Sequence, residues 1–121
     1  MIELKDVKAA YLQDIAVKPY FLRDTESPNN HFLFTIGYEA LYEISRLFTK
    51  KVFTPKQIKL VYESIWNRLD TLLEVKTQYF QLYFDYTIEI IEFYKELLEQ
   101  AEEFEACENL KRLQNEFDKK K

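Results

Sequence analysis

The stretch DYTIEIIEFYKELLEQAEE, residues 85–103, decides the fold of this chain. Apolar and polar residues alternate through 80–90, as they do in a half-buried strand. The acidic residues follow a different rhythm, with steps of four and three that hold them within about 40° of one line along a helix. A strand would scatter the same residues over both faces, so we predict a helix over 79–103. This acidic line consists of Asp85, Glu89, Glu92, Glu96, Glu99 and Glu103.

Apolar residues flank the acidic line on both sides. One side carries Tyr86, Ile90, Phe93 and Leu97, and the other carries Phe84, Ile88, Ile91 and Leu98. About two-thirds of the helix circumference is therefore apolar, whereas a surface helix needs a stripe of only about 100°. We expect this helix either to lie at the centre of a helical bundle or to be shared with a second subunit.

The sequence Thr54-Pro55-Lys56-Gln57 predicts the start of another helix, over 55–74. Thr54 is a favourable N-cap residue, Pro55 suits the first helical position, and Gln57 completes a capping box. Apolar residues then recur at steps of four and three, which places them on one face of the helix. This stripe consists of Ile58, Tyr62, Ile65, Leu69 and Leu72.

No glycine or proline follows Pro55 in the remaining 66 residues. One unbroken helix of that length would extend about 100 Å, which is too long for a compact domain. The apolar rhythm breaks at Lys76 and resumes at Tyr79, so we predict a turn or kink within 74–78. The alternative is a continuous coiled-coil-like arm that tolerates Lys76 at a core position.

Three further helices are predicted from the same periodicity. The stripe Leu4, Val7, Tyr11 and Ile15 indicates a helix over 3–17. Pro19 disfavours helical geometry at Lys18, and residues 18–29 have the composition of a loop. A helix over 30–50 follows, and its inward stripe is Leu33, Gly37, Ala40, Ile44 and Leu47. The last helix, over 104–118, carries Ala106, Leu110, Leu113 and Phe117.

The chain has 121 residues, with 47% hydrophobic and 31% charged side chains, one glycine and three prolines. This composition fits a single globular domain over 1–121, and the scarcity of turn residues argues against a sandwich or barrel. We therefore predict an all-α fold, a four- or five-helix antiparallel bundle with one long aromatic-rich helix. No apolar run reaches the ~20 residues of a membrane span, and no secretory signal pattern opens the chain. The single Cys107 favours a cytoplasmic location.

The net charge of −4 conceals an uneven distribution. Residues 46–59, called here the basic connector, contain no acid. Their cationic residues are Arg46, Lys50, Lys51, Lys56 and Lys59. Residues 85–108 contain nine acids and one base, Lys95. If the helices fold back on one another, the basic connector can pair with the acidic line in one molecule. Otherwise each region is available to a partner of opposite charge.

Few residue patterns suit catalysis or cofactor binding. A single glycine excludes a glycine-rich phosphate loop. His31 and Cys107 would form a nucleophile–base pair only if folding happened to bring them together. Paired acids such as Glu89 and Glu92 lack the histidine partners of a di-metal helical bundle. We therefore expect no enzyme activity, no cofactor and no metal ion.

A non-catalytic protein-binding module is the function that we expect. Examples are a small cytoplasmic adaptor, a chaperone-like subunit, or an inhibitor of a larger protein, such as a toxin-neutralising or phage counter-defence protein. The acidic line is the candidate partner-binding surface. Its partner is another protein or a second copy of the chain, with a homodimer favoured and a membrane excluded. The alternatives are a nucleic-acid-associated subunit that contacts phosphates through the basic connector, which the net acidity disfavours, and a structural self-associating protein.

Overall fold

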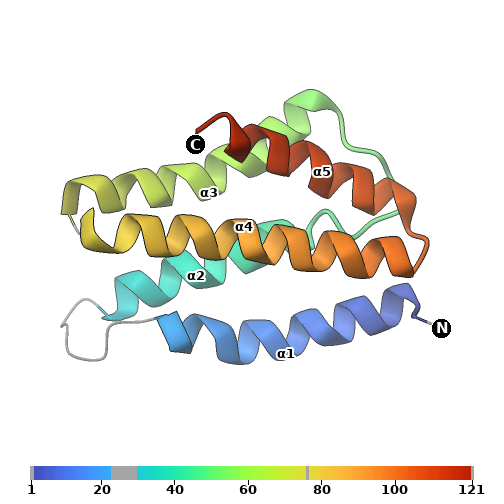
Figure 1. Ribbon diagram of the computed structural model, residues 1–121, viewed down its shortest axis with the longest axis horizontal. Coiled ribbons are helices and arrows are strands. Elements are labelled where there is room, and N and C mark those ends of the chain that lie inside the picture. The colour runs from blue at the N-terminus through green and yellow to red at the C-terminus, as the bar shows by residue number, and fades with distance from the viewer. Residues whose placement is uncertain (1, 23–29, 76, 121) are drawn as a thin grey trace.

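The computed structural model describes residues 2–22, 30–75 and 77–120. Within 17–35 it describes only the backbone of 17–22 and 30–35, and not the side chains. The described chain forms five α-helices and contains no β-strand. They are α1 (Leu4–Leu22), α2 (Asn30–Ser45), α3 (Pro55–Val75), α4 (Thr77–Gln100) and α5 (Phe104–Asp118). The helices pack against one another, which confirms the predicted all-α fold (Figure 1). None of the described helices is long and apolar enough to cross a membrane.

Helix α4 lies at the centre of the bundle and packs against each of the other four helices (Figure 1). Side chains on both sides of its acidic line are buried. The expectation that this helix lies at the centre of a helical bundle is therefore met within one chain. These residues are Tyr83, Phe84, Tyr86, Thr87, Ile88, Ile90, Ile91, Tyr94 and Leu98. Helices on several sides of α4 exclude water from its wide apolar surface, and a second subunit is not required for that purpose.

Helices α3 and α4 lie side by side and run in opposite directions (Figure 1). Helix α3 ends at Val75 and α4 begins at Thr77, whereas Lys76 lies outside the described residues. The predicted turn within 74–78 is therefore confirmed, and the alternative of a continuous coiled-coil-like arm is wrong. The physical reason is that Lys76 places a charged residue within the apolar row, and folding back at this point lets the apolar stripes on its two sides face the same core.

The start of α3 has the capping box that its sequence predicts. The Thr54 backbone N–H donates to Gln57 Oε1 at 2.8 Å, and the Gln57 N–H donates to Thr54 Oγ1 at 3.2 Å. These bonds satisfy two donors that a helix start otherwise leaves without a partner. All five residues of the predicted α3 stripe are buried. This helix follows from local sequence alone.

Two helix ends differ from the prediction. Helix α1 continues through Pro19 to Leu22, so the expected stop at Lys18 is wrong, as is the loop assignment of 18–22. A proline inside a helix removes one backbone hydrogen bond and costs about 3 kcal/mol, and packing of α1 against α2 and α4 offsets that cost. The rest of the predicted loop, 23–29, lies outside the described residues.

Helix α2 ends at Ser45 rather than near Lys50. Its last turn tightens, because Arg46 N–H donates to Glu43 O at 3.2 Å and Leu47 N–H donates to Ile44 O at 3.0 Å. Ser45 Oγ donates to the Tyr42 carbonyl at 2.6 Å and so competes with the backbone for an acceptor. The chain then leaves the helix axis while the side chains of Leu47 and Phe48 remain buried.

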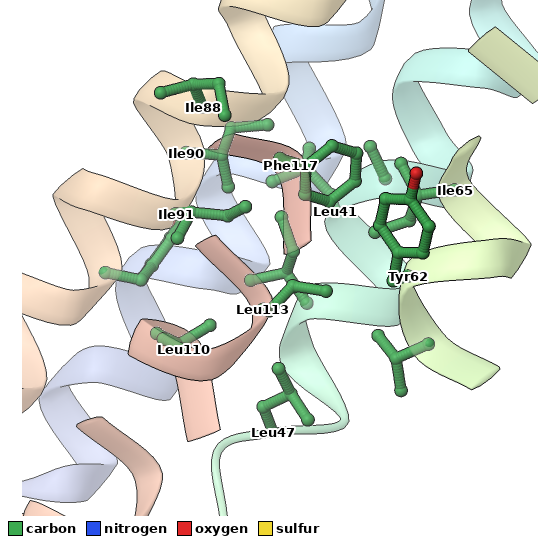
Figure 2. Close-up of a cluster of buried hydrophobic side chains, with 14 of the residues drawn as sticks. Leu41, Leu47, Tyr62, Ile65, Ile88, Ile90, Ile91, Leu110, Leu113 and Phe117 are labelled. Carbon is green, nitrogen blue, oxygen red and sulfur yellow. The ribbon is translucent and has the colours of Figure 1, made fainter. Parts of the chain in front are cut away.

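The core fills the space between the helices with large aliphatic and aromatic side chains. Figure 2 shows buried side chains of α4 and α5 meeting those of α2 and α3, among them Leu41, Tyr62, Ile91, Leu113 and Phe117. The predicted α5 stripe is fully buried, with Ala106, Leu110, Leu113 and Phe117 each 0% exposed. The α1 stripe packs against the same core, with Val7 buried and Leu4, Tyr11 and Ile15 partly buried. In the α2 stripe, Gly37, Ala40, Ile44 and Leu47 are buried, and the side chain of Leu33 lies outside the described residues.

Candidate protein-binding site

Five of the six predicted acidic residues lie on the solvent-exposed side of α4. These are Asp85, Glu89, Glu92, Glu96 and Glu99, and all five side chains are exposed. A helix that is buried on its other sides therefore presents one continuous acidic face to solvent. We call these five residues the acidic face.

Glu103 does not belong to this face, which corrects the prediction that the line extends to it. Helix α4 ends at Gln100, and Glu103 is the residue before α5. Glu103 N–H donates to Leu98 O at 2.9 Å, and Glu102 N–H donates to Glu99 O at 3.0 Å. Glu102, two residues after the last residue of α4, has φ 57°, so this is a Schellman ending with a left-handed residue. Helix α4 therefore ends before Glu103, which the prediction had placed on the same helix.

Among the described residues, the acidic face has few hydrogen-bond partners, and they are glutamines. Gln81 Nε2 donates to Asp85 Oδ1 at 2.9 Å, and Gln114 Nε2 of α5 donates to Glu92 Oε1 at 3.0 Å. Gln114 also accepts a hydrogen bond from Lys95 Nζ at 2.7 Å through its Oε1. Within the described residues, no ion pair joins the acidic face to a lysine or arginine.

The basic connector does not pair with the acidic face. Arg46 Nη1 instead contacts Glu43 Oε2 at 2.8 Å, and Glu43 is only 6% exposed. Lys50 lines a surface hollow of about 390 Å³ together with Glu3 and Glu103 near the start of α1. The remaining members, Lys51, Lys56 and Lys59, have exposed side chains. The structure therefore separates the two charged regions that intramolecular pairing would have joined.

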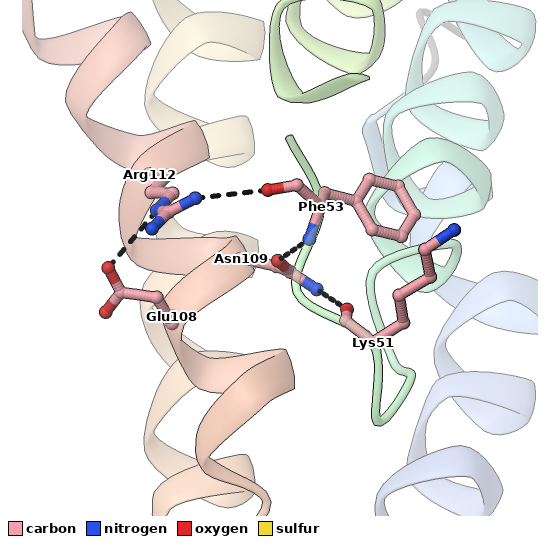
Figure 3. A network of polar contacts seen from close by, with 5 residues as sticks. All are labelled: Lys51, Phe53, Glu108, Asn109 and Arg112. Atoms are coloured by element: carbon pink, nitrogen blue, oxygen red, sulfur yellow. Dashed lines mark hydrogen bonds and ion pairs between the residues drawn. The ribbon is translucent and has the colours of Figure 1, made fainter. Parts of the chain in front are cut away.

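A polar network that the sequence analysis missed anchors the basic connector to α5 (Figure 3). Asn109 is fully buried; its Nδ2 donates to Lys51 O at 2.9 Å, and its Oδ1 accepts the Phe53 N–H at 2.8 Å. Arg112 Nη1 donates to Phe53 O at 3.1 Å, and its Nε pairs with Glu108 at 3.2 Å. These part-buried bonds give hydrogen-bond partners to backbone groups of an irregular segment that has no helix to supply them. We call this network the α5 seam.

Exposed apolar side chains adjoin the acidic face. Leu82 is 47% exposed and Phe93 is 44% exposed, and both lie on α4. At 100° per residue they lie within about 40° of Glu89 around the helix axis. Phe93 belongs to one of the two apolar sides predicted to flank the acidic line, and in the structure it is exposed at the edge of the acidic face. The surface of α4 thus combines carboxylates with an apolar edge.

The inner side of α4 carries buried hydroxyl groups. Tyr94 is fully buried and donates to the Asp14 carboxylate of α1. Burial, together with Asp14, raises the pKa of Tyr94 far above its usual value. Burial also raises the pKa of Tyr86, with Asp14 adding to the effect. The Tyr86 hydroxyl is buried and has no hydrogen-bond partner among the described residues.

Of the two residues considered for a nucleophile–base pair, only Cys107 has a described side chain. Cys107 is half-buried, and its Sγ donates to Lys95 O at 3.6 Å. Burial raises the pKa of the Cys107 thiol, and Glu99 adds to the increase, so the reactive thiolate is disfavoured. The side chain of His31 lies outside the described residues. Among the described side chains, no three His, Cys, Asp or Glu residues are placed to hold a metal ion.

The site described by these contacts is a surface rather than a cleft. It comprises the acidic face, its apolar edge at Leu82 and Phe93, and the glutamine contacts that hold Asp85 and Glu92. Comparisons of the chain with models of known protein families, with curated proteins and with solved structures found no match.

Proposed function

We propose that this protein is a non-catalytic protein-binding module whose acidic face holds a basic segment of a larger protein. The observation that supports the proposal is the exposed row of five carboxylates with no cationic partner in the described chain. An adaptor, a chaperone-like subunit and an inhibitor all require such a surface.

Electrostatic cost supports this interpretation. Acids four residues apart on a helix repel each other, at a cost of a few tenths of a kcal/mol for each pair. Asp85 and Glu89 form one such pair, and Glu92 and Glu96 form another. Folding gains nothing from this arrangement, whereas a basic partner gains both steering and complementary contacts.

The apolar edge suits the same function. Interfaces between proteins combine an apolar centre with a polar rim, and aromatic residues are enriched at their energetic centres. Phe93 and Leu82 supply apolar area directly beside the carboxylates. A partner that presents cationic and apolar side chains together fits this surface better than nucleic acid does, since phosphates would be repelled by the acidic face.

The proposal is tested by comparing what two tagged proteins capture from cells of the native host. One is the unaltered chain, and the other is the triple variant Glu92→Gln, Glu96→Gln, Glu99→Gln. We expect at least one protein with a basic segment to be captured by the first and depleted about tenfold with the second. Nuclease treatment before capture removes proteins that are held only through nucleic acid.

Equal capture of every protein by the two chains contradicts the proposal. Capture that disappears after nuclease treatment favours the alternative in which the basic connector contacts phosphates. A matched control is Lys56→Gln, Lys59→Gln, which alters exposed charges of the basic connector and leaves the acidic face intact. This control distinguishes the two charged regions of the same chain.

A further inference from the structure

One end of the acidic face opens into a surface hollow of about 370 Å³. Phe80, Gln81, Phe84, Asp85 and Lys120 line it, and we call it the aromatic recess. The rings of Phe80 and Phe84 pack nearly perpendicular to the Trp66 ring, with centroids at 5.9 and 6.4 Å. Trp66 is half-buried and packs against the edge of the core. The recess is therefore aromatic, partly open and bordered by one carboxylate.

A cation of the same chain borders this recess. Lys120 Nζ lies 4.9 Å from the centroid of the Trp66 ring, within the distance at which an ammonium group and an aromatic face attract each other. Lys120 follows the end of α5 and is attached there by one backbone bond, from its N–H to Phe117 O at 2.9 Å. Its side chain is exposed, and a cation–π contact at an exposed site contributes only about 0.5–1 kcal/mol. A competing cation can displace it at low cost.

We propose that the aromatic recess receives a lysine or arginine side chain of the basic segment that binds along the acidic face, and that Lys120 occupies this place in the free protein as an internal competitor. This inference rests on the proposed function. Asp85 belongs both to the recess and to the acidic face, so the two surfaces are continuous. Carboxylate and aromatic groups side by side favour a cation over an anion or a neutral side chain.

The spacing of the acids defines the segment that fits. Residues four apart on α4 are separated by about 6 Å along the helix axis. An extended chain advances about 6.6 Å for every second residue, and those residues point to the same side. A segment with cationic side chains at alternate positions therefore places successive cations beside Asp85 and Glu89 and a third between Glu92 and Glu96, with its terminal cation in the recess. Such a segment is about seven residues long.

The peptide Lys-Ser-Lys-Ser-Lys-Ser-Lys is the probe, used with the full chain at low salt. Fluorescence anisotropy of a fluorescein-labelled copy reports binding anywhere on the protein. Emission of Trp66, the only tryptophan, reports occupation of the recess by an unlabelled copy. We expect both signals to saturate with the same midpoint. Lys120→Ala should tighten binding about three- to fivefold, because the internal competitor is gone.

Lys119→Ala is the matched control, since it removes the same charge one residue away. Lys119 contacts Glu116 at 3.4 Å and does not line the recess. We expect this variant to change affinity less than twofold. Equal effects of the two variants, or binding with no change in Trp66 emission, overturn the inference about the recess and leave the acidic face as the binding surface. No anisotropy change at all contradicts the proposed function itself.

Discussion

The α5 seam and the acidic face are both polar, but they are built in opposite ways. In the seam, Asn109 and Arg112 satisfy the backbone of an irregular segment, and each partner comes from the same chain. On the acidic face, the carboxylates that have internal partners contact only glutamines within the described residues. Polar groups paired inside a protein hold its fold, whereas like charges in a row weaken it slightly. The difference is consistent with a stabilising role for the seam and with the binding role that we propose for the face.

The largest effect is expected at the seam, from Asn109→Ala. This change removes two hydrogen bonds and leaves the Lys51 carbonyl and the Phe53 N–H without their partner. We expect the free energy of unfolding to fall by about 3 kcal/mol, as measured by denaturant titration. Asn115→Ala is the control, because Asn115 lies exposed on the same helix. Equal losses for the two variants would show that the seam does not hold the fold.

A second effect concerns the buried hydroxyls on the inner side of α4. The pKa values of Tyr94 and Tyr86 are raised in the folded state, so both residues keep their protons at a pH where unfolded tyrosines ionise. Their contribution to stability is complete below about pH 10 and is lost as the pH rises above it. We expect the free energy of unfolding to fall by about 1.4 kcal/mol per pH unit for each tyrosine.

Denaturant titrations at several pH values between about 9 and 12 measure the slope of the free energy of unfolding against pH. This range brackets the ordinary tyrosine pKa of about 10. The variant Tyr94→Phe should reduce the slope by about 1.4 kcal/mol per pH unit, since one hydroxyl with a raised pKa is gone. It should also lower stability at neutral pH by about 1–2 kcal/mol, because the hydrogen bond to Asp14 is lost. An unchanged slope in the variant would mean that Tyr94 ionises normally in the folded protein.

The seam and the face also differ in how far the sequence predicts them. The acidic face was predicted from regular steps along one helix, as was the capping box at Thr54, because both depend on neighbours in sequence. The partners of Asn109 are 58 and 56 residues away, at Lys51 and Phe53, and no local rule joins them. The available signal was a polar residue in phase with the apolar stripe of Ala106 and Leu113. At Pro19 a local rule failed instead. Proline disfavours helical geometry at the preceding residue, but α1 continues to Leu22 because it packs against α2 and α4.

Glu102 offers a smaller test, at the turn that removes Glu103 from the acidic face. Its φ of 57° is unfavourable for any residue with a Cβ atom and natural for glycine. Glu102→Gly should therefore raise the free energy of unfolding by about 0.5–1 kcal/mol. Calorimetry of the two proteins measures the corresponding rise in Tm. A loss of stability would indicate that the Glu102 side chain makes a contact worth more than the backbone strain.

The smallest effect on stability is expected from the triple variant Glu92→Gln, Glu96→Gln, Glu99→Gln. Removing like charges from one helix face relieves repulsion, and glutamine at 92 still accepts the hydrogen bond from Gln114. We expect the free energy of unfolding to stay equal or to rise by up to about 0.5 kcal/mol. A fall of more than about 1 kcal/mol would place these acids among the groups that hold the fold.

The association rate of the captured partner tests the central claim most directly. It is measured by stopped-flow fluorescence for the unaltered chain and the triple variant over a series of salt concentrations. If the acidic face steers a basic partner, the rate for the unaltered chain falls steeply with salt, and the triple variant associates about tenfold more slowly at low salt with a weaker salt dependence. Identical rates and identical salt dependence for the two proteins would contradict the account.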